Sequence, residues 1–418
     1  MRFHETRNEG AANWGKPLDG VRVLSFEQYI ALPFATQILA RLGASVVKVE
    51  LPGTGEAGRA GFPFVRDARG QQAGSSFTRY NLGKKSIALD YRSKAGRALA
   101  YRLVRSSDVV CENLGPGRAE KMGLGFAALS ALNPALVYVA LSGFGQIGTS
   151  PYASRPAMAG VAEAMAGIYD FAQVPGQPPI AGPAGPLGDT TTGAFAAIGV
   201  LAALQHRTAI GLGQLVDVSM FDSMLAVCDF LPNFWSIGVR KAPDKVLRSP
   251  GLIGVCRAAD GWFTLYVLRA HQFERLSRLV GHPEWLTDHR LATPWDWADR
   301  MDDVLCPAIG AWAADKTKQE AADLVCKAGI PAGACNTADD IVSDPHVAAR
   351  GMLVEVPRDD GVAAPMLVGG MPVKMSRVTE GGETKQPLLG QHTDDVLREV
   401  LGANGTDLAT WRESGVIG

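Results

Sequence analysis

The sequence predicts an α/β protein in which a large, doubly wound, Rossmann-like domain is joined to a smaller α+β domain. Three observations support this fold class. Short apolar runs typical of buried parallel strands alternate with helical segments over the first half of the chain. The chain has 418 residues, more than one hydrophobic core usually supports, so we expect two domains. Beyond about residue 245 the alternation gives way to hairpin and helix signals.

The first strand–helix–strand unit lies between Val21 and Glu50. Residues 21–26 form an apolar run that predicts a buried strand. Pro33 stands where a helix would begin, and residues 34–42 keep helical spacing up to a glycine. Residues 44–50 form the next apolar run. This order predicts two parallel strands joined by a right-handed crossover.

The same alternation continues along the chain. We expect strands at 87–89, 109–112 and 136–141, helices at 93–105 (capped by Ser93) and 126–132, and one more apolar element around 216–231. Residues 254–267 predict a hairpin with Asp260–Gly261 as its turn, and Thr317–Glu320 is a capping box for a helix that reaches Ala328. Short strands at 352–356 and 371–375 and a helix at 393–401 follow.

These elements predict three segments. A large α/β domain covers residues 1–225, a smaller α+β domain covers 245–340, and residues 345–418 return to the large domain. The first fifteen residues are polar and are expected to form a loose extension.

Composition narrows the function classes. A formal net charge of −1 gives no sign of a surface for nucleic acid or membrane. The six cysteines contain no CxxC pair and the seven histidines show no metal-ligand spacing, so we expect a cytoplasmic protein without a metal site. The longest apolar stretch, Gly193–Leu204, is too short to span a bilayer and predicts a buried helix in a soluble protein.

One carboxylate stands among small residues in the stretch Gly188–Gly193. Asp189 there is followed by three threonines and a glycine, which leaves its oxygen atoms accessible. Carboxylates of this kind can attack an activated acyl carbon and form a covalent intermediate. Asp is also among the best helix N-caps, and an apolar helix follows directly. From these residues alone, Asp189 is either a nucleophile or a cap.

Two features suggest a dinucleotide-binding enzyme, but their context does not. Glu50 ends the second predicted strand, and Gly143–Gly148 matches GxGxxG after a strand. However, the first strand–helix turn, Glu27–Pro33, contains no glycine, and Thr149–Pro151 begin no helix that could receive a pyrophosphate. The glycines are better explained as a loop where a ligand passes close to the backbone.

Five stretches, in order along the chain, together resemble the family III CoA-transferases, which include formyl-CoA transferase and carnitine CoA-transferase. They are Leu18–Leu24 with Leu42–Glu50, Asn81–Asp90, Glu112–Gly117, Leu141–Gln146, and Gly188–Gly193 with Gly211–Asp217. The resemblance extends from Leu18 to about Val378.

The resemblance implies an activity and a site. It implies that Asp189 attacks an acyl-CoA thioester to give an aspartyl anhydride, and that CoA thiolate then forms an aspartyl-CoA thioester that an incoming acid resolves. CoA is thus a substrate rather than a tightly bound cofactor, and the active form is an interlocked homodimer. By resemblance, the CoA contacts are Ile30, Ala31, Leu89, Asp90, Tyr91, Arg92, Asn113, Leu114, Gly115, Lys121, Ser142, Gly143, Phe144 and Gly145, and a substrate contact is Gln146.

Chemistry suggests roles for some of these residues and ordinary explanations for others. Arg92 and Lys121 could pair with CoA phosphates, and backbone N–H groups in the 143–145 loop could stabilise an oxyanion. Lys84 and Lys85 are explained equally well as solvated surface cations. Asn113 could simply serve the turn that follows it.

Several positions depart from formyl-CoA transferase. That enzyme has Gln where this chain has Ile30, Arg at Leu51, Tyr at Phe144 and Glu at Gln146, and its run of four glycines has no counterpart near 245–251. The losses of polar groups make formate or oxalate an unexpected substrate and favour a larger or less polar acid.

Two rival functions share the fold. An α-methylacyl-CoA racemase needs a His-Asp pair, but the matching stretch here is Ala157-Met158-Ala159, which has no base that could move an α-proton. A non-catalytic subunit of a heteromeric transferase remains a second alternative, against which the presence of Asp189 argues.

Overall fold

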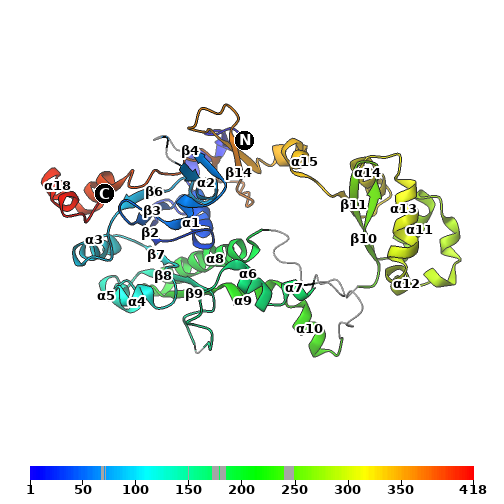
Figure 1. The fold of residues 1–418 in the computed structure, drawn as a ribbon, viewed down its shortest axis with the longest axis horizontal. Helices are drawn as coiled ribbons and strands as arrows, with labels where there is room; N and C mark the ends of the chain where they lie inside the picture. The colour runs from blue at the N-terminus through cyan, green and yellow to red at the C-terminus, as the bar shows by residue number, and fades with distance from the viewer. Residues whose placement is uncertain (67–69, 71, 149, 172–177, 179–184, 240–248) are drawn as a thin grey trace. The chain divides into compact units, whose positions relative to one another are not determined.

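The computed structural model describes residues 1–66, 70, 72–148, 150–171, 178, 185–239 and 249–418 (Figure 1). It divides the chain into two compact units. The first combines Met1–Arg240 with Ala348–Gly418, and the second covers Lys241–Val347. The sequence had placed the smaller domain at 245–340, so the two sets of boundaries differ by a few residues.

A parallel sheet of six strands forms the centre of the first unit. Its order is β6-β3-β2-β7-β8-β9. The strands are β2 (Arg22–Phe26), β3 (Ser45–Glu50), β6 (Lys85–Ala88), β7 (Val109–Glu112), β8 (Val137–Ser142) and β9 (Leu215–Ser219). From β2 the chain builds outward through β3 to β6, and then returns to place β7 on the other side of β2. This confirms the predicted doubly wound sheet.

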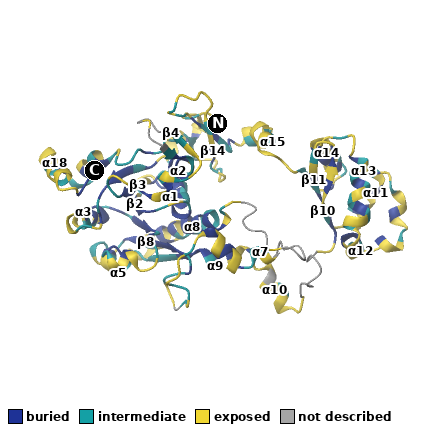
Figure 2. Ribbon diagram, viewed as in Figure 1, coloured by how far each residue is buried: buried dark blue, intermediate teal, exposed yellow. Residues whose placement is uncertain are grey.

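Helices cover both faces of the sheet. One face packs against α1 (Ala31–Arg41), α6 (Ala159–Met165), α8 (Leu187–Ile210) and α9 (Met220–Val227), and the other against α3 (Lys94–Arg105), α5 (Phe126–Leu132), α17 (Thr393–Leu401) and α18 (Gly405–Glu413). Within β8, Val137 and Val139 face the first layer, whereas Tyr138 and Ala140 face the second. Figure 2 accordingly shows the central strands as buried. Burial on both faces explains the continuous apolar runs in the sequence.

Helix α8 is longer than predicted from the sequence. It begins at Leu187 and ends at Ile210, so it includes the Asp-Thr-Thr-Thr stretch that the sequence had placed before the helix. The Thr190 and Thr192 hydroxyls donate to carbonyl groups four residues earlier, at 3.1 Å and 2.6 Å, which suits threonine to a helix. In the described part of the chain, α8 alone is long and apolar enough to cross a membrane by length and composition. It nevertheless packs against α1 in the core of the unit (Figure 1).

The expected apolar element at 216–231 is in fact strand β9 followed by helix α9, with a third element, α10 (Phe230–Ser236), beginning near its end. Smaller elements connect the larger ones: α2 (Ser75–Asn81), α4 (Arg118–Lys121), α7 (Ile168–Phe171), β4 (Phe64–Arg66) and β5 (Gln72–Gly74). The predicted cap of α3 is confirmed, because the Ser93 hydroxyl accepts a hydrogen bond from the Gly96 N–H at 3.0 Å.

The second unit holds the antiparallel sheet β10-β11-β12. Its elements are β10 (Leu252–Ala258), β11 (Gly261–Val267), α11 (Ala270–Leu279), α12 (Pro294–Asp299), α13 (Cys306–Trp312), α14 (Lys318–Lys327), β12 (Ala332–Ala334) and α15 (Ala338–Ser343). The predicted hairpin is confirmed, but Ala258 pairs with Gly261, so its turn is Ala259–Asp260, one residue earlier than expected. The predicted capping box at Thr317 is present.

Two expectations about the termini were wrong. The first residues are not loose, because β1 (Thr6–Arg7) pairs with β15 (Glu380–Gly381). Residues 371–375 form no strand; the strand that pairs with β13 (Leu353–Val356) is β14 (Met366–Gly369). A short run with alternating apolar residues does not by itself indicate whether the run pairs with another strand. The short helix α16 (Pro345–Ala349) precedes β13.

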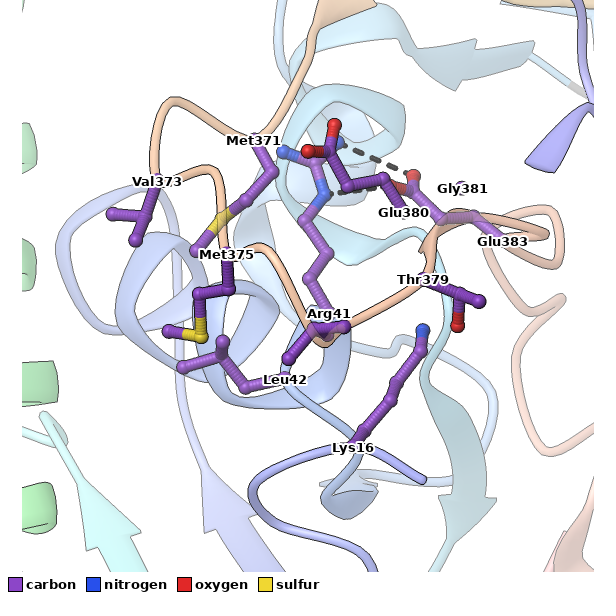
Figure 3. A pocket seen from close by; sticks show the side chains of 11 residues that line it. Lys16, Arg41, Leu42, Met371, Val373, Met375, Thr379, Glu380, Gly381 and Glu383 are labelled. Atoms are coloured by element: carbon purple, nitrogen blue, oxygen red, sulfur yellow. Dashed lines mark hydrogen bonds and ion pairs between the residues drawn. The ribbon is translucent and has the colours of Figure 1, made fainter. Parts of the chain in front are cut away.

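A small cavity lies where residues 371–383 meet the end of α1 (Figure 3). The Arg41 guanidinium and the Glu383 carboxylate form an ion pair at 2.8 Å on its wall. Its volume is about 30 Å³, which is enough for a water molecule and not for an organic substrate. This cavity is therefore too small to be the functional site.

Candidate active site

A pocket of about 320 Å³ opens at the carboxyl edge of the parallel sheet. The loops after β2 and β7 form part of its wall, and these neighbouring strands are where the strand order reverses. Doubly wound proteins bind ligands at this point of the fold. The pocket is lined by Gln28, Tyr29, Ala31, Asn113, Leu114, Gly115, Pro116, Arg118, Leu141, Ser142, Gly143, Arg155, Pro156, Ala157, Met158, Asp189 and Met220.

Asp189 is the third residue of α8 and its side chain lies at the wall of this pocket. The residue is 8% exposed. Burial, followed by the negative charge of Glu163, raises the pKa of Asp189 to about 6. Within the part of the chain that the structure describes, its carboxylate has no hydrogen bond or ion pair. The N-cap of the helix is Pro186, so the hypothesis that Asp189 is the cap is wrong.

Glycines set the position of the start of α8. A Cβ atom at Gly193 would overlap the backbone carbonyl of Ala31 in α1. A Cβ atom at Gly188 would come within 3.1 Å of the backbone of Ala159 in α6. The first turns of α8 therefore touch two other helices through their backbones, and Asp189 lies between the two glycines.

Asn113 joins the two loops that form the pocket wall. Its side-chain oxygen accepts the Gln28 N–H at 2.8 Å, and its side-chain nitrogen donates to the Gln28 carbonyl at 3.0 Å. The next residue, Tyr29, has a left-handed φ of 59° and donates its N–H to Glu56 at 3.0 Å. Asn113 thus holds together two loops that are 85 residues apart, which a simple turn residue would not do.

The glycine loop differs from the expectation. The Gly145 N–H donates to the Ser142 hydroxyl at 2.9 Å, so it is already occupied and does not serve as the predicted oxyanion donor. A Cβ atom at Gly143 would overlap that of Ala157, so this glycine is needed for packing within the protein as well as for the pocket wall. Phe144 is buried among aromatic rings, 5.5 Å from the ring of Tyr152, and does not line the pocket.

Gln146, the expected substrate contact, is engaged inside the protein. Its side-chain nitrogen donates to Glu112 at 3.0 Å, and its backbone N–H donates to Asp217 at 2.6 Å. Burial raises the pKa of Glu112 to about 7. The Leu114 N–H donates to the other oxygen of Glu112 at 2.9 Å.

A second pocket, also of about 320 Å³, adjoins the first. Gln28 and Leu114 line both pockets, and the second also includes Leu51 and Tyr91. Of the other expected contacts, Ile30 is half-buried directly before α1, and Leu89 is buried. Arg92 is exposed and pairs with Asp90 at 3.2 Å, and Lys121 is exposed on α4.

Several residues of the pocket wall were not predicted from the sequence, among them Tyr29, Arg118 and Arg155. Arg118 directly follows Gly117, three residues before Lys121, so its position after the glycine turn was a signal that could have found it. Arg155 stacks on the ring of Tyr152 at 4.2 Å, which no sequence pattern indicates. None of the described residues that line this pocket is a histidine.

A buried ionic network lies beneath the ends of β2, β3 and β6. The Lys84 ammonium is fully buried and donates to Glu27 at 2.7 Å, to the Pro33 carbonyl at 2.9 Å and to Asn81 at 2.9 Å. The Lys48 ammonium is 3.4 Å from the same Glu27 oxygen. These two lysines outweigh the effect of burial and lower the pKa of Glu27 to about 2. Lys84 is therefore not a surface cation.

Comparison with known proteins identifies the family. The model of the family described as CoA-transferase family III matches residues 18–393. The chain is 35% identical over 410 residues to a succinyl-CoA–D-citramalate CoA-transferase of Chloroflexus aurantiacus, covering 96% of this chain and 98% of the relative. It is 31% identical over 430 residues to a formyl-CoA:oxalate CoA-transferase of Bradyrhizobium sp., covering 96% and 97%.

A solved structure shares the fold. The crystal structure of a CAIB/BAIF family protein from Brucella suis superposes with a TM-score of 0.79 at 32% sequence identity, covering 92% of this chain and all of that one. Sequence and structure agree over nearly the whole length. The chain belongs to the CoA-transferase family III.

Proposed function

We propose that this protein transfers CoA from an acyl-CoA to a carboxylic acid, with Asp189 as the nucleophile. One observation supports this most strongly. A carboxylate that is 8% exposed lies at the wall of the pocket at the strand-order reversal and has no partner among the described residues. A buried carboxylate without a hydrogen-bonded partner lowers the stability of the folded protein. Such groups are frequent at functional sites, which supports a catalytic role for Asp189.

The proposed reaction passes through two covalent forms of the Asp189 carboxyl group, a mixed anhydride and a CoA thioester. The carboxylate attacks the thioester carbonyl and the carbon–sulfur bond breaks. CoA leaves as a thiolate, and Asp189 is left as a mixed anhydride with the donor acyl group. The thiolate then attacks the aspartyl carbonyl, which gives an aspartyl-CoA thioester and releases the donor acid. The acceptor carboxylate attacks this thioester, which expels the CoA thiolate and gives a second mixed anhydride. The thiolate finally attacks the acceptor's carbonyl carbon in this anhydride. This step frees Asp189 and the new acyl-CoA.

The pocket suits this chemistry. Helix α1 begins at Ala31 on the pocket wall, and the first N–H groups of a helix have no partners inside it. They would favour the negative charge that develops on an attacked carbonyl oxygen. Low exposure of Asp189 limits the access of water, which would hydrolyse the anhydride.

We propose that CoA extends through both adjoining pockets. The wall residues Gln28 and Leu114 would lie along the middle of the molecule, since they line both cavities. Arg118, Lys121 and Arg92 are exposed cations that could pair with its phosphates. The choice of acid would depend on the wall formed by Met158 and Tyr29, because Phe144 does not line the pocket.

The test is the Asp189→Asn variant together with trapping of the intermediate. Asparagine has nearly the same size and cannot form the anhydride, so we expect a normally folded protein without turnover. Wild-type protein incubated with acyl-CoA and then hydroxylamine or borohydride should show a mass change on the peptide that contains Asp189. Full activity of the variant, with deamidation excluded by mass spectrometry, contradicts the proposal. Exchange of α-hydrogen with deuterated solvent, without an adduct, would instead identify a racemase.

We also propose that the active form is a homodimer. Apolar side chains of α8 and α10 are exposed in the single chain, among them Ile198, Ile210, Phe230 and Trp235. Exposed apolar patches on soluble proteins often mark protein interfaces. Light scattering coupled to size-exclusion chromatography should give twice the 44.3 kDa chain mass. A stable, active monomer would contradict this proposal, and activity only with a second, different chain would support the heteromeric alternative.

A further inference from the structure

Glu163 is a buried carboxylate on α6 that is not among the residues predicted from the sequence. It is 2% exposed. One of its oxygen atoms accepts the backbone N–H of Gly188 at 2.8 Å, and the other accepts the hydroxyl of Tyr169 at 2.8 Å. Both oxygens act as acceptors, as in an ionised carboxylate. Gly188 directly precedes Asp189, so Glu163 contacts the turn that carries the proposed nucleophile.

Glu163 supplies the hydrogen-bond acceptor that an N-cap side chain would otherwise provide. Pro186, at the N-cap position of α8, makes no side-chain hydrogen bond to the first turn. The N–H of Gly188 belongs to that turn and has no acceptor inside the helix. Glu163 supplies the acceptor from a different helix. Because a Cβ atom at Gly188 would come within 3.1 Å of Ala159, the same two helices also meet through their backbones.

The charge of Glu163 acts on Asp189 as well. After burial, it is the second cause that raises the pKa of Asp189. The other titratable or charged groups near Asp189 or on its pocket wall are Tyr29, Arg118 and Arg155, and Tyr80 of α2 with Arg79 beside it. Burial raises the pKa of Tyr80, and the charge of Asp189 contributes to the same shift. Helices α1 and α9 contribute Ala31 and Met220 to the wall, which carry no charge.

We propose that Glu163 is a positioning residue for the reaction: it fixes the first turn of α8 and places a second negative charge beside Asp189, which favours acyl transfer onto Asp189. An acylated Asp189 is uncharged, so acylation removes one of two neighbouring negative charges. The repulsion between the two charges destabilises the free carboxylate of Asp189 relative to the anhydride and the thioester. It also makes this carboxylate more basic. This inference rests on the proposed function, because it requires Asp189 to be acylated.

The experiment compares Glu163→Gln with Tyr169→Phe in the full-length protein. Glutamine keeps an oxygen for the Gly188 N–H and an amide that can meet the Tyr169 hydroxyl, but it removes the charge. We expect the acid limb of the pH dependence of kcat/KM to move from about pH 6 toward lower pH, without reaching the unperturbed value of 3.8, because burial of Asp189 persists. At neutral pH, kcat should fall several-fold, because a less basic carboxylate is a weaker nucleophile.

Tyr169→Phe is the matched control. It removes the other hydrogen-bond partner of Glu163 and leaves its charge, so the acid limb should stay where it is or move to higher pH. An acid limb that is unchanged in Glu163→Gln, in a variant that still forms the Asp189 adduct, overturns the inference and leaves the proposed function intact. Absence of the adduct in wild-type protein overturns the proposed function itself. If Glu163→Gln does not fold, a downward shift in Tyr169→Phe overturns the inference.

Discussion

Replacing Lys84 by methionine is expected to destabilise the first unit strongly, whereas the same change at Lys85 should have little effect. The Lys84 side chain is fully buried and pairs with Glu27, which is also fully buried. The Lys85 side chain is 39% exposed and lies 3.2 Å from Glu399, which is 61% exposed. Methionine keeps most of the apolar stem at both positions, so the comparison isolates the charge.

The contacts of Lys84 and Glu27 set the expected loss in the free energy of unfolding. Removing one partner of a buried ion pair typically costs about 3–5 kcal/mol, because the other charge is left uncompensated. In Lys84→Met, Glu27 keeps Lys48 at 3.4 Å and the hydroxyl donors Ser25 and Thr36, so we expect a loss near 3 kcal/mol, roughly the lower end of that range. An exposed pair contributes about 0–1 kcal/mol, which sets the expectation for Lys85→Met.

Urea unfolding followed by circular dichroism measures both variants, with the second unit as an internal reference if the two units unfold separately. The double variant Glu27→Gln with Lys84→Met should recover much of the lost stability, because the uncompensated carboxylate is gone. Equal shifts of the unfolding midpoint in Lys84→Met and Lys85→Met would refute the reasoning. So would a double variant that is less stable than Lys84→Met alone.

Two further predictions concern the site. Burial raises the pKa of Glu112 from 4.5 to about 7, so this group contributes stability below pH 4.5 that is lost as the pH rises through 7. Glu112→Gln should therefore gain about 3 kcal/mol over wild type between pH 4 and pH 8, measured by urea unfolding, and a gap that does not widen with pH contradicts this. Gly193→Ala should lower stability by about 1–3 kcal/mol and reduce turnover, because its Cβ atom would overlap the Ala31 carbonyl. In an open helix the same change would add about 1 kcal/mol, so a stabilised variant in thermal unfolding contradicts the packing argument.

Local patterns in the sequence were sufficient to predict many elements of both units. The apolar runs of β2, β3, β7 and β8, the Ser93 cap and the Thr317 capping box were all predicted within one or two residues. These features depend on residues close together in the chain, which periodicity and capping rules describe well. The resemblance to family III CoA-transferases also came from the sequence, through short stretches in a fixed order.

The start of α8 shows where local rules fail. Asp189 precedes an apolar run and follows the N-cap pattern, yet the helix begins two residues before it. Its first turn is instead held from outside, by Glu163 at 2.8 Å from the Gly188 N–H, and by the close fit of Gly193 against α1. No cap signal in the sequence indicates an acceptor that lies 25 residues away.

The sequence by itself determined the doubly wound sheet and singled out Asp189, because strand periodicity and a lone carboxylate among small residues are local properties. The tertiary structure decided which charges are buried. Lys84 and Lys85 are identical neighbours in the chain, but one is enclosed with Glu27 and the other faces solvent. The tertiary structure also brings Gln28 and Asn113, which are 85 residues apart in the chain, together in the pocket wall. Such pairings depend on how the strands cross and pack, and the energy of a charge depends on what surrounds it in space.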